Sequence, residues 1–490
     1  MTDLSRLRAL VFAIVLLTLG GILASLNGCG GTSSTTPPPP PGKIQHVVVI
    51  FQENRTPDNL FQGLCTANGG VPGCGTGAGQ YDLAQKGTDS NHNIVPLQEV
   101  NLGVTYDPDH SHTAFKAMCD LNTNVNPPQC QMDGADKIGV RCPTGMTECT
   151  FAYVNPAHVQ PYLQLAEQYT FADRMFQTNQ GPSLPAHQFI ISGTSAPTAG
   201  SNLFVSENPH NIGQPDGGCD APAGTTITLI DPTGSETSNA AIYPCFEHPT
   251  LTDLLEAKGA TWRYYTSSGY ARGAGTALWV GPEAIQHICG TLTSSGVCGG
   301  ADFTNHVILD QTQILRDITN QKLPDVSWVI PTGQASDHAG GVNSNQGPSW
   351  VASVVNAIGN SSYWGNTAIF ITWDDWGGWY DHVAPPQVLV NCAQWGCGYI
   401  YGFRVPLIVV SPYAKAKYIS KNQHDFGSIL KFIEGIFSLP SLGYADAAAD
   451  DLSDCFDMNQ TPLPFQQIPS ALDAQFFLND KTPPTDPDDD

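Results

Sequence analysis

Residues 46–54 read His-Val-Val-Val-Ile-Phe-Gln-Glu-Asn, an apolar run that ends in a carboxylate and an amide. A short, continuous apolar run of this kind is typical of a strand that is buried on both faces, as in a parallel sheet. Runs of the same character occupy residues 169–176, 326–330, 368–372 and 405–410. Helical patterns lie between them, at residues 156–168, 251–258, 349–358 and 425–437. Strands that alternate with helices predict an α/β fold with three layers, α/β/α, and a mainly parallel central sheet.

Polar side chains follow four of these five predicted strands. In strand order they are Glu53 and Asn54, then Ser183, then Asp337 and His338, and finally Asp374 and Asp375. In open α/β sheets, ligands bind beyond the carboxyl ends of the strands. An isolated Asp-Asp pair is usually a solvated turn, and a lone loop histidine is usually exposed. The shared position of these residues after strands nevertheless indicates one site at one edge of the sheet.

The residue types at this edge suit phosphoryl chemistry. Glu53, Asp374, Asp375 and the Asn54 carbonyl offer hard oxygen ligands for one divalent metal ion, which favours Ca²⁺, Mg²⁺ or Mn²⁺ and leaves iron and zinc open. Ser183 lies in Gly-Pro-Ser-Leu-Pro, just before the helical pattern of residues 186–191, and a helix start favours an anion. We therefore expect a phosphoryl group to meet the helix on one side and the metal on the other.

The composition excludes several classes of protein. The chain has 490 residues, a formal net charge of −24 and 44 acidic against 20 basic residues. A nucleic-acid binder needs a broad cationic face, and so does electrostatic docking to anionic lipid; we therefore expect neither. Hydrophobic residues make up 41% of the chain, which is enough to bury a sizeable core.

The 14 cysteines indicate an oxidising compartment. No Cys-x-x-Cys pair is present, so a zinc ribbon is not expected. Their spacings are local and predict six loop-stapling disulfides, although connectivity cannot be deduced from sequence. The pairs would be Cys65/Cys74, Cys119/Cys130, Cys142/Cys149, Cys219/Cys245, Cys289/Cys298 and Cys392/Cys397. They fall largely in Gly-, Asn- and Pro-rich stretches at residues 62–150 and 200–245, which we expect to be insertions that cap the sheet. Cys29 and Cys455 are left over.

The N-terminus predicts export. Arg6 and Arg8 precede an apolar run at residues 9–26, which is the pattern of a signal peptide. Residues 26–29 read Leu-Asn-Gly-Cys and resemble a bacterial lipobox, with Cys29 as the lipidated mature terminus. An ordinary signal peptide and an uncleaved anchor helix stay open as alternatives. We thus expect a lipoprotein-type signal peptide (1–28), a Ser/Thr/Pro-rich tether (29–42), a folded domain (43–478) and an acidic, disordered tail (479–490).

These motifs together resemble the bacterial phosphoesterase family of phospholipases C and acid phosphatases, within the alkaline-phosphatase-like superfamily. The resemblance runs from about Lys43 to about Leu442. It rests on residues 46–61, on Gly181-Pro-Ser-Leu-Pro185, on Ser336-Asp-His338, on the most diagnostic run, Thr372-Trp-Asp-Asp-Trp-Gly-Gly-Trp-Tyr-Asp-His-Val-Ala-Pro-Pro386, and on residues 401–414 and 424–434.

The resemblance implies a role for each matching residue. The metal ligands would be Glu53, Asn54, Asp374 and Asp375, and Ser183 would be the covalent nucleophile. His110 and His338 would contact the phosphoryl group, with Asp337 orienting its neighbour and His287 as a further phosphate-contacting histidine. His382 would be supporting or structural. The domain at residues 43–478 would then be a phosphoesterase catalytic domain.

The expected activity is an exported, metal-dependent hydrolysis of phosphoric esters through a phosphoserine. The substrate would be a phosphorylated small molecule or a phospholipid head group. The family's nucleophile motif often continues Pro-Asn-Arg, whereas Ala186-His187-Gln188 follows Pro185 here, which favours a phosphatase slightly over a dedicated lipase. No sulfatase maturation motif surrounds Ser183. The alternatives are a non-catalytic surface lipoprotein that binds metal or phosphate and a structural envelope protein. We expect a periplasmic or cell-surface lipoprotein, or a secreted protein, that meets a membrane only through its N-terminal lipid.

Overall fold

The central sheet positions the expected site. The computed structural model describes residues 42–65, 73–209, 217–237, 241–267, 277–341, 343, 345–388 and 398–484. Its main sheet has eight strands in the order β13-β12-β14-β1-β15-β16-β8-β17. Their bounds are β1 His46–Gln52, β8 Thr170–Ala172, β12 Trp262–Tyr265, β13 Val307–Ile308, β14 Val326–Val329, β15 Thr367–Trp373, β16 Leu407–Val410 and β17 Tyr418–Ser420. The strands β1, β14 and β15 are fully or almost fully buried, as their apolar runs predict.

Most of the sheet is parallel, with one exception. Strand β1 pairs in parallel with β14 on one side and with β15 on the other. Strand β16 is antiparallel to both β15 and β8, and β8 returns to the common direction. The predicted strand at residues 169–176 is wrong in extent, because it divides into β8 and the separate β9 (Met175–Phe176), which pairs with β18 (His424–Asp425). The prediction of a mainly parallel sheet is confirmed.

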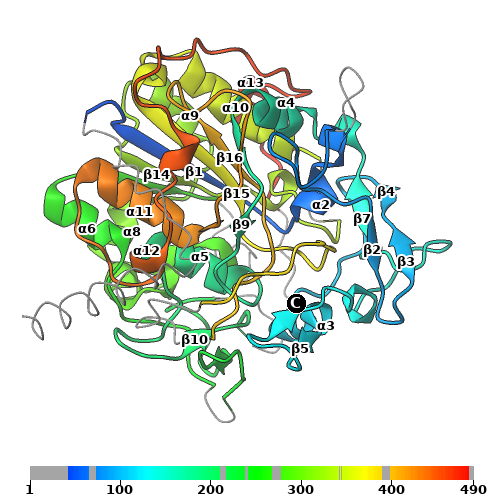
Figure 1. Ribbon diagram of the computed structural model, residues 1–490. Coiled ribbons are helices and arrows are strands. Elements are labelled where there is room, and N and C mark those ends of the chain that lie inside the picture. Colours follow the sequence, from blue (N-terminus) through cyan, green and yellow to red (C-terminus); the bar gives the residue numbers. More distant parts are fainter. Residues whose placement is uncertain are drawn as a thin grey trace, which may run out of the picture. The chain divides into compact units, whose positions relative to one another are not determined.

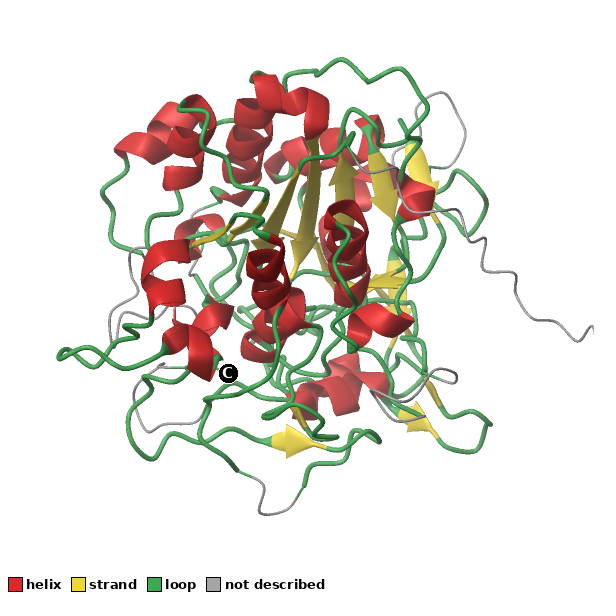
Figure 2. Cartoon of the chain, turned by 90° about the vertical axis from the view of Figure 1, so that its left-hand side faces the viewer, coloured by secondary structure: helices red, strands yellow, loops and turns green. Residues whose placement is uncertain are grey.

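Helices cover both faces of the sheet and complete three layers. On one face α10 (Gly347–Gly359) contacts α4 (Gln160–Gln168), α9 (Gln313–Thr319) and α13 (Ala474–Asn479). On the other, α11 (Phe426–Phe437) contacts α5 (Ser183–Ser192), α6 (Leu251–Lys258) and α12 (Ala445–Ala448). Figure 1 shows these groups on opposite sides of the strands, and Figure 2 shows helices lying across the sheet. The α/β/α prediction is therefore confirmed.

An insertion at residues 73–155 carries short strands beside the sheet: β2 (Lys86–Thr88), β3 (Ile94–Pro96), β4 (Gln98–Val100), β5 (Leu121–Asn122), β6 (Gln129–Cys130) and β7 (Ala152–Val154). It also holds helix α3 (His112–Cys119). Its apolar core includes Phe115, which packs against Trp376 and Phe403 of the main domain. The insertion is thereby fixed to the loop that follows Asp375.

The remaining elements are short. They are the helices α2 (Pro57–Leu60), α7 (Gln286–Cys289) and α8 (Ala301–His306) and the strand pair β10 (Phe204–Val205) and β11 (Leu229–Ile230). Within the described ranges, no helix combines the length and apolar character that a membrane span requires.

Five of the six expected disulfides are formed: Cys65–Cys74, Cys119–Cys130, Cys142–Cys149, Cys219–Cys245 and Cys289–Cys298. Cys455 is a buried thiol. The expected Cys392/Cys397 pair lies outside the described residues, as do the signal peptide, Cys29 and the tether up to residue 41. The expected acidic tail is described only as far as Pro484.

Candidate active site

The carboxyl ends of β1 and β15 bring the expected metal ligands together. The strands are in register to their last residues, with Gln52 opposite Trp373. Glu53 and Asn54 directly follow β1, and Asp374 and Asp375 directly follow β15. The Asp374 amide donates to the Gln52 carbonyl at 2.9 Å, and the Glu53 amide donates to the Ser336 carbonyl at 2.8 Å. The turn after β1 is thus hydrogen-bonded to the residues that follow β14 and β15.

Asp374 organises the local backbone. Its Oδ1 accepts the amide N–H of Asn54 at 2.8 Å and that of Asp375 at 2.7 Å. Asn54 has a φ of 62°, and the loop after Asp375 passes close to it. A Cβ on Gly377, which has a φ of 62°, would lie 2.4 Å from the Asn54 carbonyl oxygen, so only glycine fits there. The Gly-Gly pair of the diagnostic motif therefore has a steric reason.

Several oxygens in this cluster have no hydrogen-bond partner among the described residues. They are Asn54 Oδ1, Asp374 Oδ2 and Asp375 Oδ2, and all three are buried. Burying carboxylate oxygens without a partner is costly unless a cation neutralises them. One amide oxygen and two carboxylate oxygens, next to the Glu53 carboxylate, form the donor set that a hard divalent cation prefers. These residues therefore fit a divalent metal ion.

The electrostatics of the metal-free cluster show the same need. Burial, and then repulsion from Asp374, raises the pKa of Glu53 well above its usual range. Burial, and then repulsion from Asp374, likewise raises the pKa of Asp375. Burial, the largest single cause, acts to raise the pKa of Asp374, but the interactions with Glu53, His187, Ser183 and the Asn54 amide together outweigh it and lower that pKa. Without a cation, two of the three carboxyl groups, Glu53 and Asp375, therefore keep their protons to a higher pH than they would in water.

Ser183 lies at the start of α5 and faces Glu53. Its Oγ is 3.5 Å from Glu53 Oε2, and the residue is buried. The helix begins at Ser183 itself, three residues before the predicted start. Its first turn offers fewer free N–H groups than expected, because the Leu184 amide donates to Asn208 Oδ1 at 3.0 Å and Pro185 has none. Anion binding at this helix start would therefore depend largely on side chains.

Asn208 is a functional candidate that the sequence did not indicate. Its side-chain oxygen, Oδ1, accepts the backbone N–H of Leu184, the residue after Ser183. Its buried Nδ2 has no hydrogen-bond partner in the described part of the chain. A buried, unused amide donor beside the expected nucleophile suits a phosphoryl oxygen. No local motif marks this residue, which lies 25 positions after Ser183 in the loop that follows the short strand β10.

His110 reaches the site from the insertion. Its Nδ1 lies 3.1 Å from the Pro108 carbonyl, and Asn54 Nδ2 lies 2.9 Å from its Nε2. The carbonyl can only accept, so Nδ1 carries the proton and Nε2 accepts from Asn54. This hydrogen bond turns the Asn54 oxygen away from His110. His110 therefore orients Asn54, one of the expected metal ligands, and these two contacts occupy both of its ring nitrogens.

His338 lies beside His110, with ring centroids 5.8 Å apart. Its Nδ1 is 3.6 Å from a carboxylate oxygen of Asp107. Asp337, the preceding residue, has a φ of 75°, and its carbonyl accepts two hydrogen bonds from Arg55. The backbone that presents His338 is therefore held by a buried arginine.

Asp337 has partners away from the histidines. Its Oδ2 accepts from the Tyr162 hydroxyl at 2.7 Å and from Trp373 Nε1 at 3.2 Å. Burial raises its pKa to about 6. These contacts tie the loop after β14 to α4 and β15, so Asp337 acts on His338 through the backbone that the two residues share.

His287 is not in the site. It pairs with Glu247 at 2.9 Å and with Asp253 at 3.2 Å. Its charge lowers the pKa of the neighbouring His248, although burial is the larger cause of that shift, and His248 contacts Ser192 at the C-terminal end of α5. His287 thus lies at the opposite end of α5 from Ser183. This position does not favour the expected phosphate contact, because an acidic pair at the helix end holds the His287 ring.

His187 takes a place that the sequence did not assign. It lies one helical turn after Ser183 and is buried, with Nε2 3.2 Å from Glu53 Oε1. Residues four apart share one face of a helix, so a Ser-x-x-x-His spacing at a helix start was the available signal. Ser183 and His187 thus contact the two oxygens of the same carboxylate.

His382 belongs to a buried ion-pair network. It contacts Asp58 at 2.7 Å and Asp82 at 3.1 Å, while Arg404 pairs with Asp381 at 2.8 Å. Burial lowers the pKa of His382, but Asp58 and Asp82 outweigh it and raise the value to about 10. The network joins the loop after β15 to the insertion, which supports the structural reading of His382.

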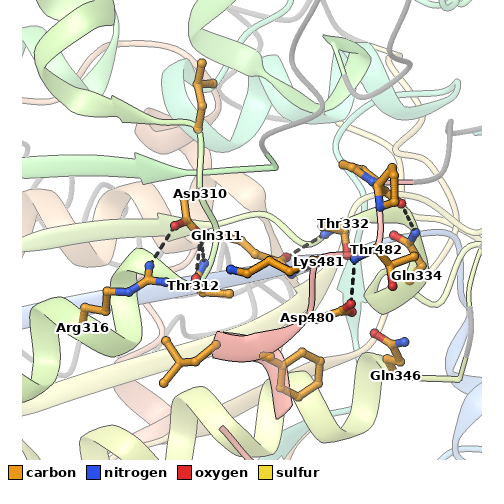
Figure 3. A pocket seen from close by; sticks show the side chains of 15 residues that line it. Asp310, Gln311, Thr312, Arg316, Thr332, Gln334, Gln346, Asp480, Lys481 and Thr482 are labelled. Carbon is orange, nitrogen blue, oxygen red and sulfur yellow. Dashed lines mark hydrogen bonds and ion pairs between the residues drawn. The ribbon is translucent and has the colours of Figure 1, made fainter. Parts of the chain in front are cut away.

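A cavity of about 360 Å³ lies elsewhere, between α9 and the C-terminal segment (Figure 3). Arg316 and Lys481 line it together with Asp310 and Asp480, and Arg316 pairs with Asp310 at 2.8 Å. It contains none of the expected catalytic residues. We therefore place the chemistry at the buried strand ends and not in this cavity.

Comparisons with known proteins agree with the geometry. The non-hemolytic phospholipase C of Pseudomonas aeruginosa is 25% identical over 469 residues, covering 89% of this chain and 60% of that protein. Phospholipase C A of Mycobacterium tuberculosis is 24% identical over 463 residues, covering 86% and 78%. The chain thus spans about 60% of the length of the first of these relatives.

A solved structure of an alkaline phosphatase superfamily protein from Vibrio parahaemolyticus is 10% identical and covers 84% of this chain and 71% of its own, with a TM-score of 0.34. That score is too low to carry an argument. The model of the Phosphoesterase family, in contrast, matches residues 44–440, which include every expected ligand and Ser183. The chain belongs to the Phosphoesterase family.

Proposed function

We propose that this protein is an exported, metal-dependent hydrolase of phosphoric esters that works through a phosphoserine at Ser183. The observation that carries the proposal is the position of Ser183 Oγ, 3.5 Å from Glu53, beside a cluster of buried oxygens without partners. Family membership supports ester hydrolysis. The five disulfides, together with the signal-like sequence before Cys29, support export.

Glu53, Asn54, Asp374 and Asp375 would hold the metal. When bound, a divalent ion neutralises the carboxylates and lowers the pKa of a neighbouring hydroxyl. Ser183 Oγ then forms the bond to phosphorus as the bond to the leaving oxygen breaks. In the second step water attacks phosphorus and the bond to Ser183 Oγ breaks, which releases phosphate from a monoester substrate and a phosphomonoester from a diester.

Donors from three segments surround the place where the phosphoryl group would lie. Asn208 Nδ2 comes from the loop after β10, and His338 comes from the loop after β14. His110 comes from the insertion and would donate from Nε2 only in its protonated form, in place of its hydrogen bond from Asn54. They orient the phosphoryl oxygens, and a histidine supplies the proton that the leaving oxygen takes up. Because the ligands and Ser183 are buried, bulk water is kept from the attacking hydroxyl.

Two observations bear on the substrate class, and they point in different directions. The relatives are named phospholipases C, which favours a phospholipid head group. The Pro-Asn-Arg continuation of the nucleophile motif is replaced by Pro185-Ala186-His187, which favours a smaller phosphorylated compound. We therefore propose a phosphoester hydrolase and treat phosphatidylcholine and simple monoesters as the two substrates to compare.

The test is a substrate panel on metal-reconstituted protein. It compares phosphatidylcholine, a chromogenic diester and a chromogenic monoester, with the wild type and Ser183→Ala side by side. We expect Ser183→Ala to lose at least a thousandfold in turnover with an unchanged circular dichroism spectrum. A phosphorylated Ser183 should be found by mass spectrometry after acid quenching. Full activity of Ser183→Ala would remove the nucleophile assignment, and metal binding without hydrolysis of any ester would favour a non-catalytic binder.

A further inference from the structure

His187 is placed to act on the metal site directly. It lies on α5 one turn after Ser183, and its buried Nε2 is 3.2 Å from Glu53 Oε1. This nitrogen, a carboxylate oxygen of Glu53 and one of Asp374 all lie within 4.8 Å of one another. Three potential ligand atoms, from α5 and from the residues that follow β1 and β15, therefore lie close enough together to share one ion.

The hydrogen bonds on the far side of the ring fix its tautomer. His187 Nδ1 lies 3.0 Å from the Tyr264 hydroxyl. That hydroxyl donates its only hydrogen to the Trp279 carbonyl at 2.6 Å and accepts the Gly281 amide at 3.3 Å. A hydroxyl has one hydrogen and two lone pairs, so its remaining capacity is to accept. Nδ1 must therefore be the donor to Tyr264.

Nε2 is then the nitrogen with a lone pair in the neutral ring, and that lone pair faces Glu53 and Asp374. A metal-binding histidine commonly donates its other N–H to an oxygen that fixes the ring orientation, which is the role Tyr264 fills here. We infer that His187 Nε2 is a nitrogen ligand of the ion held by Glu53, Asn54, Asp374 and Asp375. This inference rests on the proposed function, because it requires that metal site.

The competing arrangement is a simple ion pair. A doubly protonated His187 would donate to Glu53 Oε1 from Nε2 and would have no lone pair for a metal. The two arrangements differ in what they imply for metal choice. An imidazole ligand suits Zn²⁺ or Fe²⁺, whereas an all-oxygen site suits Ca²⁺, Mg²⁺ or Mn²⁺. Nitrogen ligation therefore predicts a preference for Zn²⁺ over Ca²⁺.

Pulsed electron paramagnetic resonance on the Mn²⁺-loaded full chain separates the two arrangements. A nitrogen bound directly to Mn²⁺ gives a ¹⁴N coupling in the echo modulation. The test variant is His187→Gln, which keeps a polar side chain of similar reach but has no imidazole. The matched control is His248→Gln, which removes another buried histidine that packs against α5, at Ser192.

We expect the ¹⁴N coupling in the wild type and in His248→Gln and its loss in His187→Gln. We also expect the affinity for Zn²⁺ relative to Ca²⁺, measured by competition with a chromogenic chelator, to fall about 10-fold or more in His187→Gln. Stoichiometric Mn²⁺ binding without ¹⁴N coupling in the wild type would overturn the inference and leave the proposed function standing. Failure of the wild type to bind any of these ions would overturn the metal site itself, and the inference with it.

Discussion

The backbone N–H of Asn54 donates to Oδ1 of Asp374 at 2.8 Å, so one carboxylate both joins the ends of β1 and β15 and belongs to the candidate metal site. The other oxygen of Asp374 is buried without a described partner. The two oxygens of this side chain therefore have separate tasks, one in the fold and one in ligand binding. Asp375 differs, because among the described residues the amide of Gly377 is the one hydrogen-bond donor to its side chain, at 2.7 Å.

This difference makes Asp375→Asn a clean test of the metal site. The change removes one negative charge from a buried cluster and keeps an oxygen for the Gly377 amide. We expect metal affinity to fall by 10-fold or more, because the donor set loses a charged ligand. In the presence of a chelator, the variant should be more stable than the wild type, by about 1–3 °C in Tm, since burial and Asp374 both disfavour the charge.

Differential scanning fluorimetry with and without metal measures both effects. Asp374→Asn is the matched comparison, since it also disturbs the hydrogen bonds to Asn54 and Asp375 and should destabilise the protein in either condition. A chelated Asp375→Asn protein that melts below the chelated wild type would contradict the assignment of this cluster as a cation site.

The stability of the metal-free protein should depend on pH in a defined direction. The pKa values of Glu53 and Asp375 are raised in the folded state. A group with a raised folded pKa contributes stability that is complete below its unfolded value, near 4, and is lost as pH rises through its folded value. Tm in chelator should therefore fall between about pH 5 and pH 8. Added metal should raise Tm more at pH 8 than at pH 5, because the ion must displace protons. An equal metal-induced shift at both values would contradict this linkage.

Elements specified by local chemistry were predictable from the sequence. Helix α6 has the bounds Leu251–Lys258 that its pattern predicts, and Thr250 and Asp253 form a capping box at its start. The ligands after β1 and β15 were predictable for a related reason. The carboxyl ends of buried parallel strands meet at one edge, so residues far apart in sequence could be placed together.

Features that depend on tertiary pairing were not predictable. The apolar run of β16 is the same whether the strand is parallel or antiparallel to β15. His287 and His187 show the same limit within the site. Each is a histidine near a helix, and only the acidic pair around His287 and the Glu53 carboxylate near His187 distinguish their roles. No sequence motif around Asn208 indicates its position in the site.

The buried network around Arg404 should be a major source of stability. Arg404 is fully buried and pairs with Asp381 at 2.8 Å and with Asp58 at 3.4 Å. Replacing it with methionine leaves the buried Asp381 carboxylate without its cation and Asp58 with His382 alone, which costs about 3–5 kcal/mol of unfolding free energy. Arg174→Met removes only a partly exposed pair with Asp82 and should cost about 0–1 kcal/mol. Urea unfolding measures the difference. Similar losses for both variants would show that the network contributes little beyond a surface pair.

The two histidines that the sequence placed near phosphate should now behave differently. His110 contacts Asn54 inside the site, whereas His287 lies with Glu247 and Asp253 at the far end of α5. We expect His110→Ala to lower kcat by about 10²–10⁴, because it removes a substrate contact and the partner that orients Asn54. His287→Ala should retain kcat within about twofold of the wild type, since it touches none of the reacting groups.

Steady-state hydrolysis of a chromogenic ester at saturating metal measures both variants, and equal melting temperatures would show that folding is not the cause. If His287→Ala lost as much activity as His110→Ala, the site would have to extend to the other end of α5, and the placement of the phosphoryl group beside Ser183 would be wrong.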